Sequence, residues 1–421
     1  MSRPAPVVLD DLAAPLFSPE IDQLRAAMAE MAPACPLEAG EILAAARQQT
    51  GLDDAGDDRF LHRLEILCAA LRNEAGLSGP GVVSWYSQLL QTIKNRLLIQ
   101  DVLNRHPEIH DLEITRPIII AGLPRTGTTH LHNLISADPA LRSLPYWESL
   151  EPVLAESERP APGQPDSRLA RTAFGLEVAD QMMPYFKRMH EMTVDHVHEE
   201  IQLLAIDVST MLFETLSLMP SWRDSYLASD QTPSYEYLRT VLKVLQWLRG
   251  GTRWVLKSPQ HLEQFGPLRA TFPDATFVVT HRDPVAVTVS MATMIAYTAR
   301  LHTDHVDPVA VGRYWSARGE DLFRACAEDR HLLPDDQTVD VRFDEFMADD
   351  VAMVERIYDL AGQPFTRAAR EGITAFMDTH RRGRHGTVVY QPEVLGIDRD
   401  ERRRALSFYG DRFGVEPEGV D

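Results

Sequence analysis

The chain has 421 residues, of which 44% are hydrophobic and 25% charged, and its formal net charge at pH 7 is −20. This composition is typical of a globular protein, and the length allows one large domain or two ordinary ones with ample core. The acidic balance argues against a nucleic-acid-binding protein, which usually presents a basic surface. If this chain binds an anion, its basic residues must therefore converge locally.

The cysteines and the hydrophobic pattern indicate the compartment. Cys35, Cys68 and Cys326 are scattered without a C-x-x-C pair, which argues against a disulfide framework or a zinc site and fits a reducing compartment. The stretch 1–17 has no apolar core long enough for a signal peptide. No run approaches the roughly 18 apolar residues of a membrane span. We expect a soluble, cytoplasmic protein.

The first part of the chain, to about residue 110, carries helical patterns. Apolar residues recur every three or four positions in 36–51, 59–76 and 82–106. A glycine-proline cluster at 76–81 separates the second pattern from the third. Since no catalytic cluster stands here, we expect residues 1–112 to form a helical extension that shapes the substrate side.

From residue 113 to residue 421, short apolar segments alternate with helical patterns. The predicted strands are 117–123, 253–258, 275–282 and 337–343. The clearest helical patterns are 234–250, 284–300, 351–362 and 366–380. Such alternation predicts an α/β domain over 113–421, with a parallel sheet covered by helices on both faces. The proline-rich stretch 156–168 reads as a surface loop.

A glycine loop follows the first of these strands. Gly122 and Gly127 stand as in G-x-x-x-x-G-K-[ST], the triphosphate-binding loop, but Thr128 occupies the lysine position. A strand that ends in such a turn and opens a helix presents several N–H groups to one oxyanion. Without the lysine, the loop suits one compact anion better than a magnesium-bound triphosphate. The expected fold is thus P-loop-like.

The stretch "PRTGTT", residues 124–129, resembles the phosphosulfate-binding loop of sulfotransferases that use 3′-phosphoadenosine 5′-phosphosulfate (PAPS). It is similar to the P-R-S-G-T-T form of tyrosylprotein sulfotransferases and of many bacterial sulfotransferases. The resemblance implies that the 5′-phosphosulfate is bound by Arg125, Thr126, Gly127, Thr128 and Thr129.

A second motif strengthens this resemblance. In "FVVTHRDPVAVTVSM", Arg282 follows a strand and Ser290 lies eight residues later on the next helix. Sulfotransferases place such an arginine and serine on the 3′-phosphate of the donor. Guanidinium and hydroxyl donors at a strand end and in the first turns of a helix suit a phosphate physically as well.

Two further segments extend the likeness. Lys257 in "RWVLKSPQHL" resembles the lysine of K-S-P segments, which reaches the bridging oxygen of the phosphosulfate, and His261 follows it by four residues. In "HRRGRHGTVVY", the basic residues Arg382, Arg384 and His385 fit the basic loop that closes over the 3′ end of the donor. A solvated basic loop is the plain alternative for this last stretch.

The acceptor hydroxyl needs a base within hydrogen-bond reach. His190 matches an M-H pair of bacterial relatives, and Glu148 resembles the catalytic glutamate of tyrosylprotein sulfotransferases, although its spacing from the loop is longer. We rank His190 first, Glu148 second and His261 third. The stretch 187–204 also contains His196, His198, Glu199 and Glu200. It shows no distant third zinc ligand, so we expect no metal site.

The sequence therefore predicts a PAPS-dependent sulfotransferase that acts on a small-molecule alcohol or phenol and leaves 3′-phosphoadenosine 5′-phosphate, by in-line transfer without a metal. One alternative is a P-loop-type small-molecule kinase that uses ATP and magnesium. Another is a catalytically silent nucleotide-binding protein. The sequence leaves the acceptor and the oligomeric state open.

Overall fold

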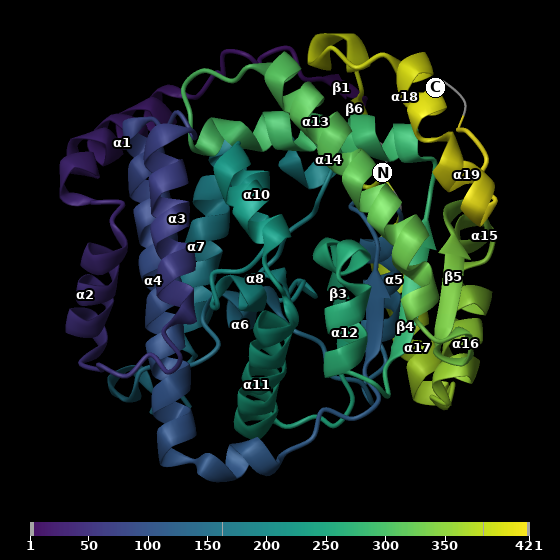
Figure 1. The fold of residues 1–421 in the computed structure, drawn as a ribbon, viewed down its shortest axis with the longest axis horizontal. Helices are drawn as coiled ribbons and strands as arrows, with labels where there is room; N and C mark the ends of the chain where they lie inside the picture. Colours follow the sequence, from purple (N-terminus) through teal and green to yellow (C-terminus); the bar gives the residue numbers. More distant parts are fainter. Residues whose placement is uncertain (1–3, 162, 382, 419–421) are drawn as a thin grey trace.

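The computed structural model of the protein describes residues 4–161, 163–381 and 383–418. Helices surround a four-stranded parallel sheet (Figure 1). The strands, in their order across the sheet, are β3 (Val255–Ser258), β2 (Ile118–Ala121), β4 (Thr276–His281) and β5 (Thr338–Arg342). Each lies within one of the four apolar segments predicted above. The expected fold class, an α/β fold with a P-loop-like parallel sheet flanked by helices, is confirmed.

Helices precede, interrupt and follow these strands. The first 112 residues contain α1 (Pro19–Met31), α2 (Ala39–Thr50), α3 (Arg59–Asn73) and α4 (Gly79–Arg105). Between β2 and β3 lie α5 (Thr128–Ser136), α6 (Tyr146–Leu150), α7 (Ser167–Met182), α8 (Ile201–Ala205), α9 (Leu212–Leu216), α10 (Pro220–Ala228) and α11 (Thr232–Arg249). After β3 come α12 (Phe265–Thr271), α13 (Pro284–Thr298), α14 (Pro308–Asp329), α15 (Phe343–Ala348), α16 (Asp350–Ala361), α17 (Arg367–Thr379), α18 (Arg399–Ala405) and α19 (Ser407–Phe413).

The two faces of the sheet bury different sets of side chains, because successive residues of a strand point to opposite faces. Ile118 and Ile120 belong to a small core that includes residues of α5, α16 and α17. Ile119 belongs to a much larger core, which extends through α11, α13 and α14 into the N-terminal helices. This burial on both faces explains why the strands are continuous apolar runs.

The N-terminal helices share the larger core. Trp85 of α4 is fully buried, and its ring centroid lies 5.8 Å from that of Phe213 in α9. Leu64 of α3 and Leu97 of α4 belong to the same cluster as Ile119 of the sheet. The hydrophobic core thus runs continuously across residue 112. The division of the chain there into a helical extension and an α/β domain stays a prediction from the sequence.

Helix α13 and the turn after it bear on the expectation that no apolar run approaches the length of a membrane span. Within the described residues, the window Pro284–Leu301 is long and apolar enough to cross a membrane by length and composition, with a mean hydropathy of 1.2. It contains alanine, threonine and serine among its larger apolar residues, so it does not read as one unbroken apolar run. Of this window, 72% is buried inside the protein. A core helix satisfies the same criterion.

Gly122 allows the glycine loop to lie against β4. A Cβ atom added to Gly122 would lie 1.9 Å from Oγ1 of Thr280, a side chain of the neighbouring strand. Thr126 of the loop shares a 2.7 Å hydrogen bond with the same Thr280 hydroxyl. Glycine at this position is thus required by the close approach of two buried elements, and the approach fixes the loop at the end of the sheet.

The substitution Gly122→Ala should destabilise the protein by about 1–3 kcal/mol, because the added methyl group overpacks a buried contact. Urea unfolding would measure the change. Gly40→Ala in α2 is the matched control: nothing lies within 4 Å of its added Cβ, so it should leave stability equal or slightly higher. Equal stability of Gly122→Ala and the wild type would contradict this packing argument.

Candidate active site

The loop between β2 and α5 has the geometry of an anion-binding turn. Gly127 has φ = 88° and caps α5, whose first turn begins at Thr128. Arg125 has φ = 76°, an unusual conformation for a residue other than glycine. Backbone strain of this kind often marks a functional position. The start of α5 and the turn before it together offer N–H groups to an oxyanion.

The threonines of the loop differ in what their hydroxyls do. The Thr126 side chain is buried, and its hydroxyl donates to the carbonyl of Leu123 at 2.7 Å. Since it also meets Thr280, this hydroxyl holds the loop to the sheet. Thr128 is buried as well, whereas Thr129 is half-buried. Of the three threonine side chains predicted to bind the donor, Thr126 has its hydroxyl committed inside the protein.

Arg125 brings together segments that are distant in the sequence. Its Nε donates to the hydroxyl of Ser290 in α13 at 3.0 Å, and one terminal nitrogen donates to the hydroxyl of Tyr390 at 3.3 Å. The other terminal nitrogen donates to the carbonyl of Met189. Thus two of the predicted site residues, Arg125 and Ser290, are in direct contact. Met189 directly precedes His190, so the hydrogen bond to its carbonyl joins Arg125 to the segment that carries His190.

Lys257 lies beside the loop on the neighbouring strand. In the parallel register, Ile120 of β2 pairs with Lys257 of β3. The Lys257 side chain is buried and its ammonium group forms an ion pair with Glu199. Its backbone N–H donates to Oε2 of Glu200 at 2.8 Å. Two adjacent glutamates therefore fix the lysine, one through its side chain and one through its backbone.

His261 is committed to a buried hydrogen-bond chain. Its Nε2 lies 2.5 Å from Oε1 of Glu200, and its Nδ1 lies 2.8 Å from the hydroxyl of Tyr235. The His261 side chain is fully buried. With both ring nitrogens engaged and no exposed surface, His261 cannot reach an acceptor hydroxyl. This geometry does not favour His261 as the base that the sequence suggested; through Glu200 it is linked to the backbone of Lys257.

Glu148 is equally unsuited to proton transfer. Its side chain is fully buried and forms ion pairs with Arg142 at 2.6 Å and Arg249 at 3.1 Å. The backbone of Arg142 donates to the carbonyl of Arg253, which lies before the amino end of β3. The helix of Glu148, α6, also contacts the histidine segment, since Tyr146 donates its backbone N–H to the carbonyl of His196 at 2.9 Å. Glu148 neutralises two arginines.

Four histidines lie near the loop and Lys257. The ring centroids of His190 and His196 are 5.4 Å apart, and those of His196 and His198 are 5.9 Å apart. Neither ring nitrogen of the buried His198 has a hydrogen-bond partner among the described residues. His132 of α5 is buried behind them. The cluster lies between two cationic residues, Arg125 and Lys257, which both repel a proton from it.

These surroundings keep the histidines neutral. Burial, reinforced by the positive charges of Lys257 and Arg125, holds the pKa of His190 well below its usual value. Burial and then Lys257 lower the pKa of His196 to about 4. The pKa of His198 and of His132 is likewise lowered, chiefly by burial. These shifts keep the half-buried His190 unprotonated at neutral pH.

Arg282 follows β4, the strand on the other side of β2. One of its terminal nitrogens donates to the carbonyl of Arg125 at 2.6 Å, and its guanidinium stacks on the ring of Phe343 with a centroid distance of 4.1 Å. Its other edge binds the carboxylate of Glu418. The loop arginine and Arg282 are thus linked, while Ser290 contacts Arg125 from the helix that Arg282 precedes.

The basic loop near residue 385 is only partly described. Arg384 forms an ion pair with Glu191, and His385 lies 2.9 Å from the same carboxylate. This places Arg384 beside the residue that follows His190. Arg382, also predicted to bind the donor, lies outside the described residues. Among those that are described, no group of three or more His, Cys, Asp or Glu side chains is arranged to hold a metal ion.

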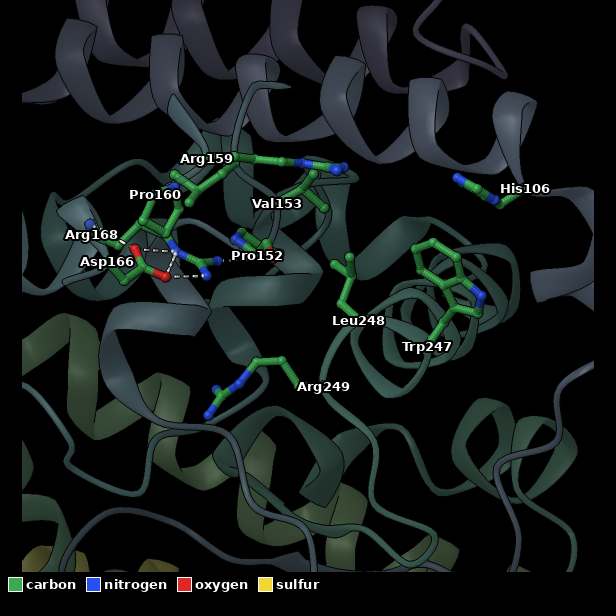
Figure 2. A pocket seen from close by; sticks show the side chains of 11 residues that line it. His106, Pro152, Val153, Arg159, Pro160, Asp166, Arg168, Trp247, Leu248 and Arg249 are labelled. Carbon is green, nitrogen blue, oxygen red and sulfur yellow. Dashed lines mark hydrogen bonds and ion pairs between the residues drawn. The ribbon is translucent and has the colours of Figure 1, made fainter. Parts of the chain in front are cut away.

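A cavity of about 420 Å³ lies elsewhere (Figure 2). Arg168 and Arg249 line it, together with the ring pair Trp247 and His106. Arg168 is bound by Asp166, and Arg249 by Glu148, so both cations are already paired. The lining contains no residue of the loop 122–129. This arginine-lined hollow is therefore separate from the anion-binding turn.

The fold and the site define an α/β protein with a P-loop-like anion-binding turn, flanked by a buried lysine and two arginines. A sulfotransferase family model matches residues 117–367. The chain belongs to the sulfotransferase family.

Individual relatives agree with this assignment. Omega-hydroxy-beta-dihydromenaquinone-9 sulfotransferase Stf3 of Mycobacterium bovis is 25% identical over 264 residues, which cover 58% of this chain and 62% of the relative. The chain thus matches less than two thirds of the length of that relative. The crystal structure of sulfotransferase STF1 from Mycobacterium tuberculosis is 27% identical and superposes with a TM-score of 0.76, covering 89% of this chain and 99% of the other.

A second solved structure supports the fold. Sulfotransferase STF9 from Mycobacterium avium is 24% identical and superposes with a TM-score of 0.80, covering 91% of this chain and 98% of the other. Both solved neighbours extend over the N-terminal helices as well as the sheet, since the aligned parts exceed the region 117–367.

Sequence reasoning missed several partners in the site. Tyr235, Tyr390 and Glu418 were not singled out, because each is far along the chain from the residue that it contacts. Glu199 and Glu200 were named only as members of the stretch 187–204, without a partner. The signal available in the sequence was a lysine at the end of an apolar strand, because a buried lysine demands a charged or polar partner in a low-dielectric interior.

The histidine cluster should make stability depend on pH in a defined direction. Between the lowered pKa of about 4 for His196 and the ordinary value of about 6.5, the unfolded chain binds more protons than the folded one. The free energy of unfolding should therefore fall as the pH is lowered from 7 to 5. Urea unfolding at both pH values would measure this loss, and His198→Phe should reduce it.

The exposed His62, whose side chain is 79% exposed, provides the control. His62→Gln should leave the difference between pH 7 and pH 5 unchanged, because this side chain stays in contact with water when the protein folds. Acid also protonates carboxylates, so the informative quantity is the difference between each variant and the wild type. If His198→Phe and the wild type lost the same free energy of unfolding between pH 7 and pH 5, the buried histidine would not contribute to this pH dependence.

Proposed function

We propose that the protein transfers the sulfuryl group of PAPS to a hydroxyl of a small-molecule alcohol or phenol, leaving 3′-phosphoadenosine 5′-phosphate. The observation that carries the proposal is the arrangement of Arg125, Lys257 and Arg282 around one sheet edge. They stand at or after the carboxyl ends of three adjacent strands. The chain that carries them belongs to the sulfotransferase family. Ligands of open α/β sheets bind at this edge.

The proposed roles follow from the positions of the charges. The turn at 125–129 would hold the 5′-phosphosulfate through its backbone N–H groups, with Arg125 supplying a cationic donor. Lys257 would stabilise the charge that develops on the oxygen of the leaving phosphate. Arg282 would bind the 3′-phosphate, with Ser290 close by and Arg382 and Arg384 from the basic loop. No metal ion enters this scheme.

His190 is the base that we propose. It is half-buried, its pKa is lowered, and the residue before it binds Arg125 through its carbonyl. In the transfer, the acceptor oxygen forms a bond to sulfur while the bond from sulfur to the phosphate oxygen breaks. His190 would take the proton from the acceptor hydroxyl, and the freed electron pair would remain on the phosphate.

The acceptor class is suggested by the name of the relative Stf3, which acts on a hydroxylated dihydromenaquinone. An alcohol on an apolar body is therefore the first acceptor class to test here. We also propose a cytoplasmic location, since Cys35, Cys68 and Cys326 are buried thiols without disulfide partners, as a reducing compartment would keep them.

Ligand binding tests the donor. Adenosine 3′,5′-bisphosphate should bind the wild-type protein in a calorimetric titration, and Arg282→Ala should weaken it by about 10–100-fold through loss of charge-assisted hydrogen bonds. Arg367→Ala is the matched control, because that side chain is 91% exposed. Thermal unfolding would verify that both variants fold. Binding of ATP with magnesium, and not of the bisphosphate, would overturn the proposal and favour a kinase.

Turnover tests the two chemical roles. With PAPS and an alcohol acceptor, Lys257→Ala should lower kcat by about 10²–10³-fold, the usual effect of losing one group that stabilises transition-state charge. His190→Asn should lower kcat by about 10²–10⁴-fold. His331→Asn, on the exposed surface, should leave kcat unchanged. Full activity of His190→Asn would remove this histidine as the base.

A further inference from the structure

The segment after α19 returns to the predicted donor site. Both carboxylate oxygens of Glu418 bind Arg282, at 2.5 Å from Nε and 2.7 Å from a terminal nitrogen. The backbone N–H of Glu418 donates to Oδ2 of Asp283 at 2.8 Å. Asp283 caps the start of α13, the helix that carries Ser290. Glu418 thus lies at the junction of β4 and α13.

Contacts further back fix the path of this segment. Val415 donates its backbone N–H to the carbonyl of Gly410 in α19 at 3.1 Å, and Arg342 donates to the carbonyl of Gly414 at 3.3 Å. The segment 414–418 therefore runs from the end of α19 to Arg282 along a defined route. Its carboxylate binds the edge of the Arg282 guanidinium formed by Nε and one terminal nitrogen, while the other terminal nitrogen donates to the carbonyl of Arg125.

We propose that Glu418 is an internal competitor for the anion that binds Arg282, a regulation of the site that rests on the function proposed above. A carboxylate binds an arginine through two parallel hydrogen bonds, the same fork that a phosphate uses. The other terminal nitrogen of Arg282 donates to the carbonyl of Arg125. A 3′-phosphate that binds Arg282 through the fork of Nε and its neighbouring terminal nitrogen must therefore displace Glu418.

The pair is suited to such an exchange. The Arg282 side chain is 21% exposed and that of Glu418 is 36% exposed, so water can solvate the carboxylate when it leaves. Partly exposed ion pairs contribute little net stability, since solvent screens them. A ligand that must displace Glu418 binds with an apparent affinity equal to its intrinsic affinity multiplied by the fraction of protein in which the ion pair is open.

The other cations of the site show what is special about Glu418. Lys257 is paired with Glu199, and Arg384 with Glu191, both from the segment that also carries the histidines. Glu418, in contrast, comes from a segment beyond the last helix, and no strand of the sheet depends on it. Its other hydrogen bond, from its backbone N–H to Asp283, involves neither a sheet strand, nor the loop, nor a histidine.

The competition should be selective for the phosphate that Arg282 binds. Adenosine 5′-monophosphate has no 3′-phosphate, so it can bind the loop while the pair between Arg282 and Glu418 stays intact. Adenosine 3′,5′-bisphosphate cannot. Removal of the Glu418 charge should therefore improve binding of the bisphosphate and leave binding of the monophosphate unchanged, which distinguishes competition at one subsite from a general electrostatic effect.

Calorimetric titration of Glu418→Gln with both nucleotides tests this inference. We expect the bisphosphate to bind about three- to tenfold tighter than to the wild type, in line with the modest strength of an exposed pair. The monophosphate should bind equally to both. Glu416→Gln is the matched control: it removes the same charge from an exposed side chain two residues earlier, and should change neither affinity.

Other outcomes would overturn the inference. Equal or weaker binding of the bisphosphate by Glu418→Gln would exclude competition while leaving the proposed donor in place. A similar gain for both nucleotides, or for Glu416→Gln as well, would reduce the effect to general charge repulsion. Failure of the wild type and Glu418→Gln alike to bind the bisphosphate would overturn the proposed donor, and the inference with it.

Discussion

The parallel alignment of β2, β3 and β4 is the constraint on which the site depends. In this register Ile120 pairs with Lys257 on one side, and Ala121 pairs with Val279 on the other. The carboxyl ends of the three strands therefore meet at one edge, which brings together the residues at each strand's end. A glycine loop, a buried lysine and an arginine become neighbours although more than a hundred residues separate the loop from the other two. Their convergence supplies the local positive charge that an acidic chain requires to bind an anion.

In this protein of net charge −20, the cations of the candidate site all interact with acceptors of the protein itself. Each of the residues Lys257, Arg282 and Arg384 is paired with a glutamate, whereas Arg125 uses neutral acceptors: a serine, a tyrosine and a carbonyl. The histidines respond to the same charges in the opposite sense, because burial and nearby cations keep them unprotonated. The cations that would bind the proposed donor thus also keep the histidines beside them unprotonated.

The elements of this fold could be predicted, while the partners within the site could not. Continuous apolar runs identified all four strands of the main sheet because both faces are buried, and the glycine spacing identified the loop. Side-chain partners depend on long-range geometry: His261 meets Glu200 and Tyr235 from two other segments, and its local spacing from Lys257 gives no hint of this. The inward hydroxyl of Thr126 and the arginine pairs of Glu148 escaped prediction for the same reason, since spacing along the chain does not reveal which way a side chain points.

The small second sheet has a consequence for how the molecule reaches its folded state. Its two strands, β1 (Val7–Val8) and β6 (Val388–Val389), pair in parallel and join the beginning of the described chain to a segment near its end. The entropy lost on closing a loop grows with its length, so contacts this distant in sequence are costly to form before the core between them has folded. Val7 of β1 also donates its backbone N–H to the carbonyl of Thr387, directly before β6. A contact of very high sequence separation therefore holds the segment that follows the basic loop.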